Sequence, residues 1–193
     1  DLRLPQNASI HATQRTVDEL EQVLRDDPEF AAEIDRWSTY IGQGAIRFYL
    51  PLDVQLANPF FAQAVIVTTG IEARERLQPR LEQLLAERFP HVVGRVSPLE
   101  LGPPVGWPVQ YRVLGPEPTR LREIALELGD AIAANPGTRR VNFDWMEPKR
   151  ELHIRVDQEQ ARQLGLSSQA VATALNANIA GTLITQVRDD IYL

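Results

Sequence analysis

Residues 62–89 read AQAVIVTTGIEARERLQPRLEQLLAERF, and this stretch sets the pattern for the first half of the chain. Ala62 to Thr69 is a continuous run rich in β-branched residues, which is typical of a buried strand. Gly70 breaks the run. The helical spacing that follows, from Glu72 to Phe89, places four leucines on one face: Leu77, Leu81, Leu84 and Leu85. A buried strand followed by an amphipathic helix predicts a layered α+β fold.

The flanking segments extend this pattern on both sides. The predicted elements are a strand at Asp1–Pro5, a helix at Thr13–Arg25 with Val17, Leu20 and Leu24 inward, a strand at Ile34–Ile41 and, after the second helix, a strand at Val92–Leu101. The order β-α-β-β-α-β predicts a ferredoxin-like split βαβ sandwich, in which two helices cover one face of a four-stranded antiparallel sheet.

A second, shorter pattern follows the segment ELGPPVGWP at Glu100–Pro108, whose three prolines and two glycines fix backbone shape around Trp107. The predicted elements are a strand at Val109–Leu114, a helix with Leu121, Ile124, Leu128 and Ile132 buried, and strands at Val141–Trp145 and Leu152–Val156. This incomplete βαββ unit lacks a closing helix and strand. Asp157 and Ser167 then cap two further helices, and residues 182–187 and 191–193 suggest an unfinished hairpin.

Composition excludes several classes of function. The net charge of −6 and the scattered arginines give no basic stripe for nucleic acid. The chain has no cysteine, its histidines His11, His91 and His153 lie far apart, and Met146 is the only methionine, so no metal site and no cofactor is expected. No apolar run is long enough to span a bilayer. The start at Asp1 and the strand-like end at residues 190–193 suggest a piece of a larger protein.

Three further segments point to a family: Leu4-Pro5, VDQEQARQLGLSSQ at 156–169, and QVRDDIYL at 186–193. With the element order, they resemble the second large periplasmic loop of the resistance-nodulation-division (RND) efflux transporters, between the seventh and eighth membrane helices. The resemblance covers essentially the whole chain. It implies a first porter subdomain at 1–101, the first half of a second porter subdomain at 102–156, and the start of an inserted docking subdomain at 157–193.

The resemblance also implies a function. Such pumps are trimers of like subunits in the inner membrane that use proton influx to export amphiphilic small molecules, together with a membrane-fusion adaptor protein and an outer-membrane channel. Their proton-carrying carboxylates lie in membrane helices absent from this sequence. The segment is therefore expected to be periplasmic, to meet the membrane only through those other segments, and to recognise substrate without transporting alone.

One candidate substrate site is a loop of glycines and aromatic residues. By the resemblance, Gly42 to Tyr49 correspond to the glycine-rich loop that separates the outer and inner drug pockets. Gly42 and Gly44 would let the loop flip, and aromatic faces would meet amphiphiles, supplied by Phe48, Tyr49, Phe60 and Phe61. The alternative is a surface loop whose aromatic side chains lie in a core or a trimer contact.

A second candidate site is a cleft between the porter subdomains. Asn142 and Asp144 share one face of a predicted strand, which by the resemblance looks into this cleft. Arg3 and Arg95 could line the same cleft, and Glu100 could gate it; the alternative for all five is an exposed side chain or a salt bridge. Trp107 and Trp145 are expected in packing. The charged run Arg188–Asp190 would lie in the docking insertion, as a partner contact or a solvated turn.

Two other functions remain as alternatives. A ferredoxin-fold enzyme of acylphosphatase type would need a phosphate-cradling loop beside an arginine, and Arg47 near Gly42 and Gly44 is a poor match because Pro51 and aromatic residues follow. A purely structural protein-docking module would instead show a filled cleft and flat apolar patches, whereas a pocket with convergent polar groups would favour ligand recognition.

Overall fold

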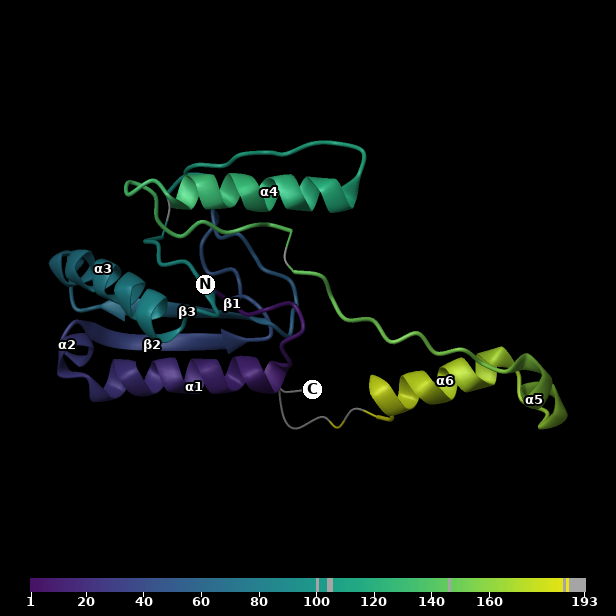
Figure 1. The fold of residues 1–193 in the computed structure, drawn as a ribbon. Helices are drawn as coiled ribbons and strands as arrows, with labels where there is room; N and C mark the ends of the chain where they lie inside the picture. The colour runs from purple at the N-terminus through teal and green to yellow at the C-terminus, as the bar shows by residue number, and fades with distance from the viewer. Residues whose placement is uncertain (100, 104–105, 146, 186, 188–193) are drawn as a thin grey trace. The chain divides into compact units, whose positions relative to one another are not determined.

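The computed structural model describes residues 1–99, 101–103, 106–145, 147–185 and 187 (Figure 1). The chain divides into two compact units, Asp1–Lys149 and Arg150–Leu193. The predicted α+β class is confirmed, because helices accompany a four-stranded antiparallel sheet in the first unit.

The sheet contains the strands β1 (Leu2–Arg3), β2 (Ile34–Ile41), β3 (Phe61–Thr68) and β4 (Val93–Gly94) in the spatial order β2-β3-β1-β4. All three neighbouring pairs are antiparallel. β2 has the predicted bounds, and β3 begins one residue earlier than predicted. β1 and β4 are shorter than the predicted strands, because each forms regular pairing over only two residues.

Two long helices lie on the sheet. Ser9 caps the start of α1 (Ile10–Asp26), where its hydroxyl accepts from the Ala12 N–H. Asp27 caps the end of α1 and the start of the short α2 (Pro28–Ala31). α3 (Ile71–Arg88) follows Gly70 as predicted and continues through Pro79.

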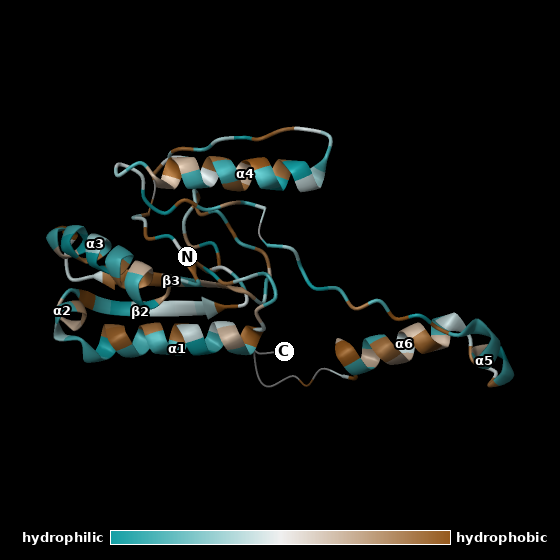
Figure 2. Cartoon of the chain, viewed as in Figure 1, coloured by the Kyte–Doolittle hydropathy of each residue, from teal (hydrophilic) through white to brown (hydrophobic). Residues whose placement is uncertain are grey.

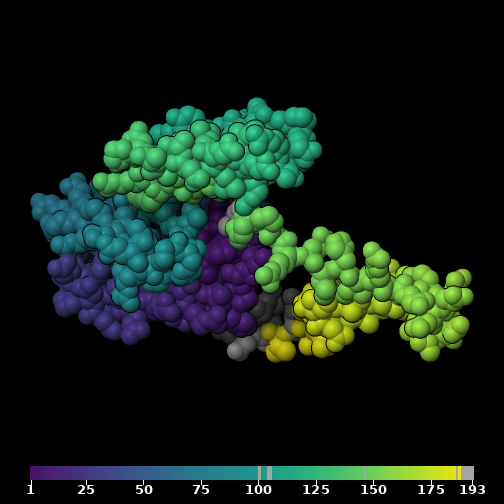
Figure 3. Space-filling view, viewed as in Figure 1, coloured from purple at the N-terminus to yellow at the C-terminus, as the bar shows by residue number. Residues whose placement is uncertain are grey.

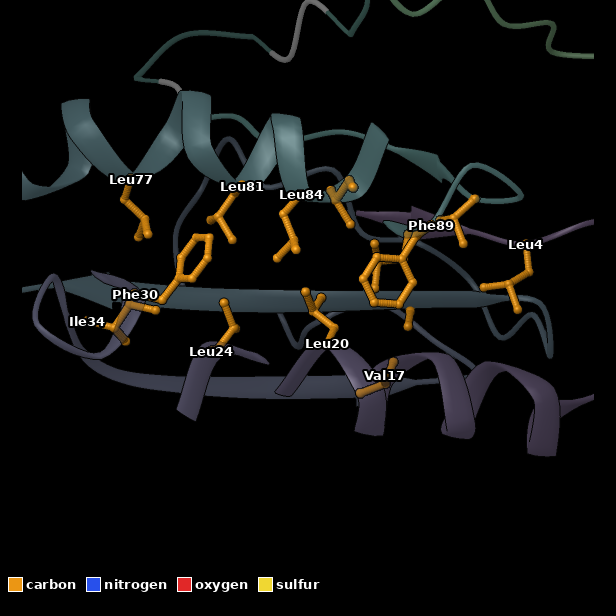
Figure 4. Close-up of a cluster of buried hydrophobic side chains, with 14 residues drawn as sticks. Leu4, Val17, Leu20, Leu24, Phe30, Ile34, Leu77, Leu81, Leu84 and Phe89 are labelled. Atoms are coloured by element: carbon orange, nitrogen blue, oxygen red, sulfur yellow. The ribbon is translucent and has the colours of Figure 1, made fainter. Parts of the chain in front are cut away.

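The main core lies between the inward faces of α1 and α3 and one face of the sheet. Leu77, Leu81 and Leu84 of α3 point toward Val17, Leu20 and Leu24 of α1, with Phe30 and Phe89 beside them (Figure 4). Figure 2 shows apolar residues in brown alternating with polar residues in teal along α1 and α3. Burial of each such side chain contributes roughly 1.5–3 kcal/mol, so this core carries most of the stability of the first unit. The predicted inward residues of both helices are confirmed.

The segment after β4 differs from the predicted βαββ unit. The helix exists as α4 (Pro118–Ala133). Among the described residues, the segments 109–114, 141–145 and 152–156 form neither helix nor strand. A strand requires a hydrogen-bonded partner, and a sheet of two or three strands needs a covered apolar face. The side chains predicted to be buried along α4 are only partly buried. Ile124 is 37% exposed, and the residue of α4 that is buried is Gly129.

The second unit contains α5 (Gln158–Gln163) and α6 (Ser168–Ile179). Both predicted caps are confirmed: Asp157 accepts from the N–H groups of Glu159 and Gln160, and Ser167 accepts from that of Ala170. The predicted hairpin is absent from residues 182–185 and 187, which are not strand; its remaining residues lie outside the described part. None of the helices in the described part of the chain is long and apolar enough to cross a bilayer.

Candidate functional site

The candidate glycine loop is the β2–β3 loop, residues 42–60, and its base is held by backbone hydrogen bonds. The Gly42 N–H donates to the Phe61 carbonyl (2.8 Å), and the Gly42 carbonyl accepts from Asn58 (2.7 Å). The Gly44 N–H donates to the Gln55 carbonyl (3.2 Å). These bonds extend the β2–β3 hydrogen-bond pairing into the first residues of the loop. Both glycines therefore lie at the base of the loop, where the backbone is held.

Both glycines are required by close packing. Gly42 has a φ of 76°, in the left-handed region, and a Cβ there would lie 2.9 Å from Cδ1 of Ile10. A Cβ on Gly44 would lie 2.9 Å from the Gln55 Cβ and 3.0 Å from its backbone nitrogen. In this conformation Gly44 permits close approach of the two sides of the loop and Gly42 permits close approach of Ile10, while the flip of the loop stays a prediction.

A polar side chain fastens the loop to the sheet. Gln63 accepts from the Ala45 N–H through Oε1 (2.7 Å) and donates through Nε2 to an Asp1 carboxylate oxygen (2.8 Å). By strand alternation Gln63 and Phe61 lie on the face of β3 opposite the main core. On this face Phe61 is 3% exposed, and in the loop Ala45 is 1% and Leu52 9% exposed. We infer that the loop covers this part of the sheet.

The four candidate aromatic residues divide into two pairs. Phe61 is buried, so its ring is not free to meet a substrate, whereas Phe60 is half-buried against the main core and also lines an open concavity. Phe48 is 48% exposed and Tyr49 is half-buried, with ring centroids 5.4 Å apart at a 36° tilt. The prediction of exposed aromatic faces is thus wrong for Phe61, which packs at the start of β3, and it stays a prediction for Phe48, Tyr49 and Phe60.

The outer part of the loop is apolar and open. Ile46, Leu50 and Leu56 are strongly exposed, at 72%, 84% and 84%. Residues 53–60 also line an open concavity of about 540 Å³, with Asp53, Gln55 and Asn58 as its polar residues. Gln55 donates to the Asp53 carboxylate (2.8 Å), and Asn58 accepts from the Phe60 N–H (3.1 Å). Exposed apolar side chains are thus presented beside fixed polar groups.

The register places Arg3 and Arg95 on one face of the sheet. Arg3 pairs with Phe61 on β3 and with Val93 on β4. Arg95, two residues beyond Val93, exchanges backbone hydrogen bonds with Asp1 (2.9 and 2.8 Å). Arg3 and Arg95 therefore lie on the same side, opposite the main core, and both are half-buried.

The candidate cleft residues of the second half are engaged locally. Asn142 Nδ2 donates to the Arg140 carbonyl (2.9 Å), and Asp144 accepts from the Trp145 N–H (2.9 Å). Because residues 141–145 form no strand, the two-residue repeat does not place these two side chains on a sheet face. Trp145 is 65% exposed, so the predicted packing of its ring is wrong for this structure.

Two predicted sites fall outside the described residues, namely Glu100 and the run Arg188–Asp190. Within the described ranges, no cluster of three or more His, Asp or Glu side chains could hold a metal ion.

Sequence reasoning missed two residues that position the loop. Thr13 of α1 is fully buried, and its hydroxyl donates to the Pro59 carbonyl (2.6 Å). Gln63 forms the bridge described above. Each is a polar residue in an otherwise apolar pattern, a threonine on the inner helix face and a glutamine inside a β-branched run. A buried polar group needs a hydrogen-bond partner, so a polar residue at a position expected to be buried could have predicted a bond to another segment.

A family model, described as the AcrB/AcrD/AcrF family, matches residues 1–192. The chain therefore belongs to this family of RND efflux transporters, which are inner-membrane transport proteins and not enzymes. Comparison with curated proteins gives no match, and neither does comparison with solved structures.

Proposed function

We propose that this chain is a periplasmic segment of a proton-driven RND pump that recognises amphiphilic substrates and takes part in trimer and tripartite assembly. Its residues 1–101 would form a ferredoxin-like porter subdomain. The βαββαβ element order and the strand order β2-β3-β1-β4 support this assignment. Residues 102–156 would begin a second porter subdomain and residues 157–193 a docking subdomain. Transport itself would require the membrane helices, which are absent from this sequence.

The exposed tip of the β2–β3 loop carries the proposal. A soluble surface seldom presents several large apolar side chains close together unless they bind something. Here Ile46, Phe48 and Leu50 alternate along the chain and are each about half exposed or more. The base of the loop is fixed by Gly42, Gly44 and Gln63, so these side chains are presented with little ordering cost on binding.

The chemistry of the tip suits amphiphiles. Phe48 and Tyr49 offer tilted aromatic faces, and Arg47 and Asp53 supply both signs of charge within the loop. Apolar contact would provide affinity, and the few polar groups would orient the ligand. Arg3, Arg95, Glu100, Asn142 and Asp144 stay proposed as secondary contacts lining a cleft in the assembled pump.

The test is drug susceptibility of cells that carry the pump with Phe48→Ala or Leu50→Ala. We expect reduced resistance to some substrates and not others, at unchanged expression. Ile71→Ala is the matched control, because Ile71 is 68% exposed but begins α3, away from the loop. An unchanged susceptibility profile at equal expression, or the same loss in Ile71→Ala, would reject the role of the loop.

A further inference from the structure

Residues 138–145 and Glu147, which follow α4, are held to the first half of the unit at two places. We call this segment the strap. Its start is fixed to the end of α4, where Thr138 donates its N–H to the Asn135 carbonyl (2.9 Å) and its hydroxyl to the Ile132 carbonyl (2.8 Å). Beyond Thr138, the strap runs beside α4 (Figures 1 and 3).

The first attachment is an ion pair with α3. Arg140 Nη2 lies 2.5 Å from Glu82 Oε2, with the two side chains only 32% and 22% exposed. Gln78, one turn earlier on α3, donates to the other Glu82 oxygen (3.3 Å) and so orients the carboxylate. A pair with this much cover is screened less by salt than a surface pair.

The backbone of the strap is bent to make this contact. Arg140 has a φ of 56°, which is costly for a residue with a side chain. The Asn142 side chain donates to the Arg140 carbonyl at 2.9 Å and supports the bend. A strained residue persists only when its surroundings hold it, which indicates that the Glu82 contact fixes Arg140.

The second attachment is a hydrogen bond from the Gln6 N–H, just after β1, to a Glu147 carboxylate oxygen (2.5 Å). Between the two attachments Phe143 packs directly on Gly129 of α4: a Cβ there would lie 2.5 Å from Cζ of the ring. In the described part of the chain, α4 has no extensive packing against another helix or strand. The strap therefore links α4 to the sandwich of α1, α3 and the sheet.

We propose that the Arg140–Glu82 pair is a conformational latch, which holds the strap and α4 in one position and releases both when it opens. The strained φ of Arg140 favours opening, and the ion pair opposes it. The latch rests on the contacts alone; only its use during transport would rest on the proposed function.

Hydrogen–deuterium exchange of the purified full-length protein tests the latch without any transport assay. Glu82→Arg should raise amide exchange in residues 138–147 by about three- to tenfold, because the local opening equilibrium shifts. Arg140→Gln should do the same. The double variant Glu82→Arg/Arg140→Glu should restore slow exchange, since the pair is re-formed with its charges swapped.

The matched control is Glu87→Arg, which makes the same charge change on α3 at an exposed residue bonded to Gln83. Wild-type exchange in both Glu82→Arg and Arg140→Gln would overturn the latch. An equal rise in Glu87→Arg, or a double variant that exchanges as fast as the single variants, would do so as well.

Discussion

At the scale of single residues, the two glycines of the β2–β3 loop differ in what a side chain would meet. Gly44→Ala places a Cβ against the Gln55 backbone, which cannot move easily, so we expect a loss of about 1–3 kcal/mol in the free energy of unfolding. Gly42→Ala is strained by its φ of 76° and meets only the flexible end of Ile10, so about 1 kcal/mol is expected.

Chemical denaturation measures both losses, and Gly102→Ala is the control. No atom of the described residues lies within 4 Å of a Cβ at Gly102, so its loss should stay within about 0.5 kcal/mol. If Gly44→Ala were as stable as Gly102→Ala, the base of the loop would not be held as described.

A second prediction concerns Gly129→Ala, whose effect on stability should change sign with the presence of the Phe143 ring. Alanine is the better helix former by about 1 kcal/mol, yet a Cβ at this position would collide with the Phe143 ring. We expect Gly129→Ala to destabilise the wild type and to stabilise a Phe143→Ala background by roughly 0.5–1 kcal/mol. Denaturation of the four variants in this double-mutant cycle checks it; equal effects in both backgrounds would contradict the contact.

The sequence predicted the burial of some single residues and not of others. The leucines of α3 could be assigned to the core because helical periodicity is local information. Phe60 and Phe61 could not be separated from Phe48 and Tyr49, since all four are aromatic residues near turns. Which of them is buried depends on the pairing of β3 with β1 and on the cover from the loop, and both are contacts between residues distant in sequence.

At the scale of elements, those with a full apolar face were predictable. α1, α3 and β2 form close to their predicted bounds, and α3 even continues through Pro79, since its leucine stripe is buried along its length. The segments after residue 108 were predicted as strands and form none. A strand needs hydrogen-bonded partner strands, and a local sequence pattern does not show whether these are present. Alternating apolar residues in 109–114 and 141–145 indicate a capacity for strand, but in the described structure they form none.

One ion pair joins two of the well-predicted elements. Arg76 of α3 donates two hydrogen bonds to the Glu33 carboxylate (2.7 and 2.8 Å), just before β2. Hydrogen bonding from Arg76 holds the pKa of Glu33 below its usual value of 4.5. A lowered folded pKa means that the pair stabilises the fold above about pH 4.5, and that this contribution disappears as the pH falls through the folded pKa.

Glu33→Gln should therefore lower the thermal midpoint at pH 7 by a small amount and match the wild type in acid. Thermal melts across pH 3–8 measure this difference. Glu72→Gln is the control: Glu72 is 92% exposed and lies 3.9 Å from the same arginine, so it should have little effect at any pH. A Glu33→Gln deficit that did not shrink as the pH fell below about 4.5 would contradict the assigned role of the charge.

At the scale of the whole molecule, the family match over residues 1–192 agrees with the RND resemblance read from the sequence. The two compact units are joined near residues 149 and 150, and the second carries an open apolar groove of about 260 Å³ on α6. Substrate choice was not predictable from the sequence, because it depends on side chains that several segments bring together.

The central claim is that the tip of the β2–β3 loop contacts substrate, and labelling of single cysteines tests it most directly. Phe48→Cys and Ile71→Cys would each be introduced into the full-length pump in a background without other cysteines, then labelled with a maleimide with and without an exported amphiphile. We predict that the amphiphile slows labelling at position 48 and leaves position 71 unchanged. Equal labelling rates at position 48 with and without an amphiphile that the variant still exports would contradict the claim.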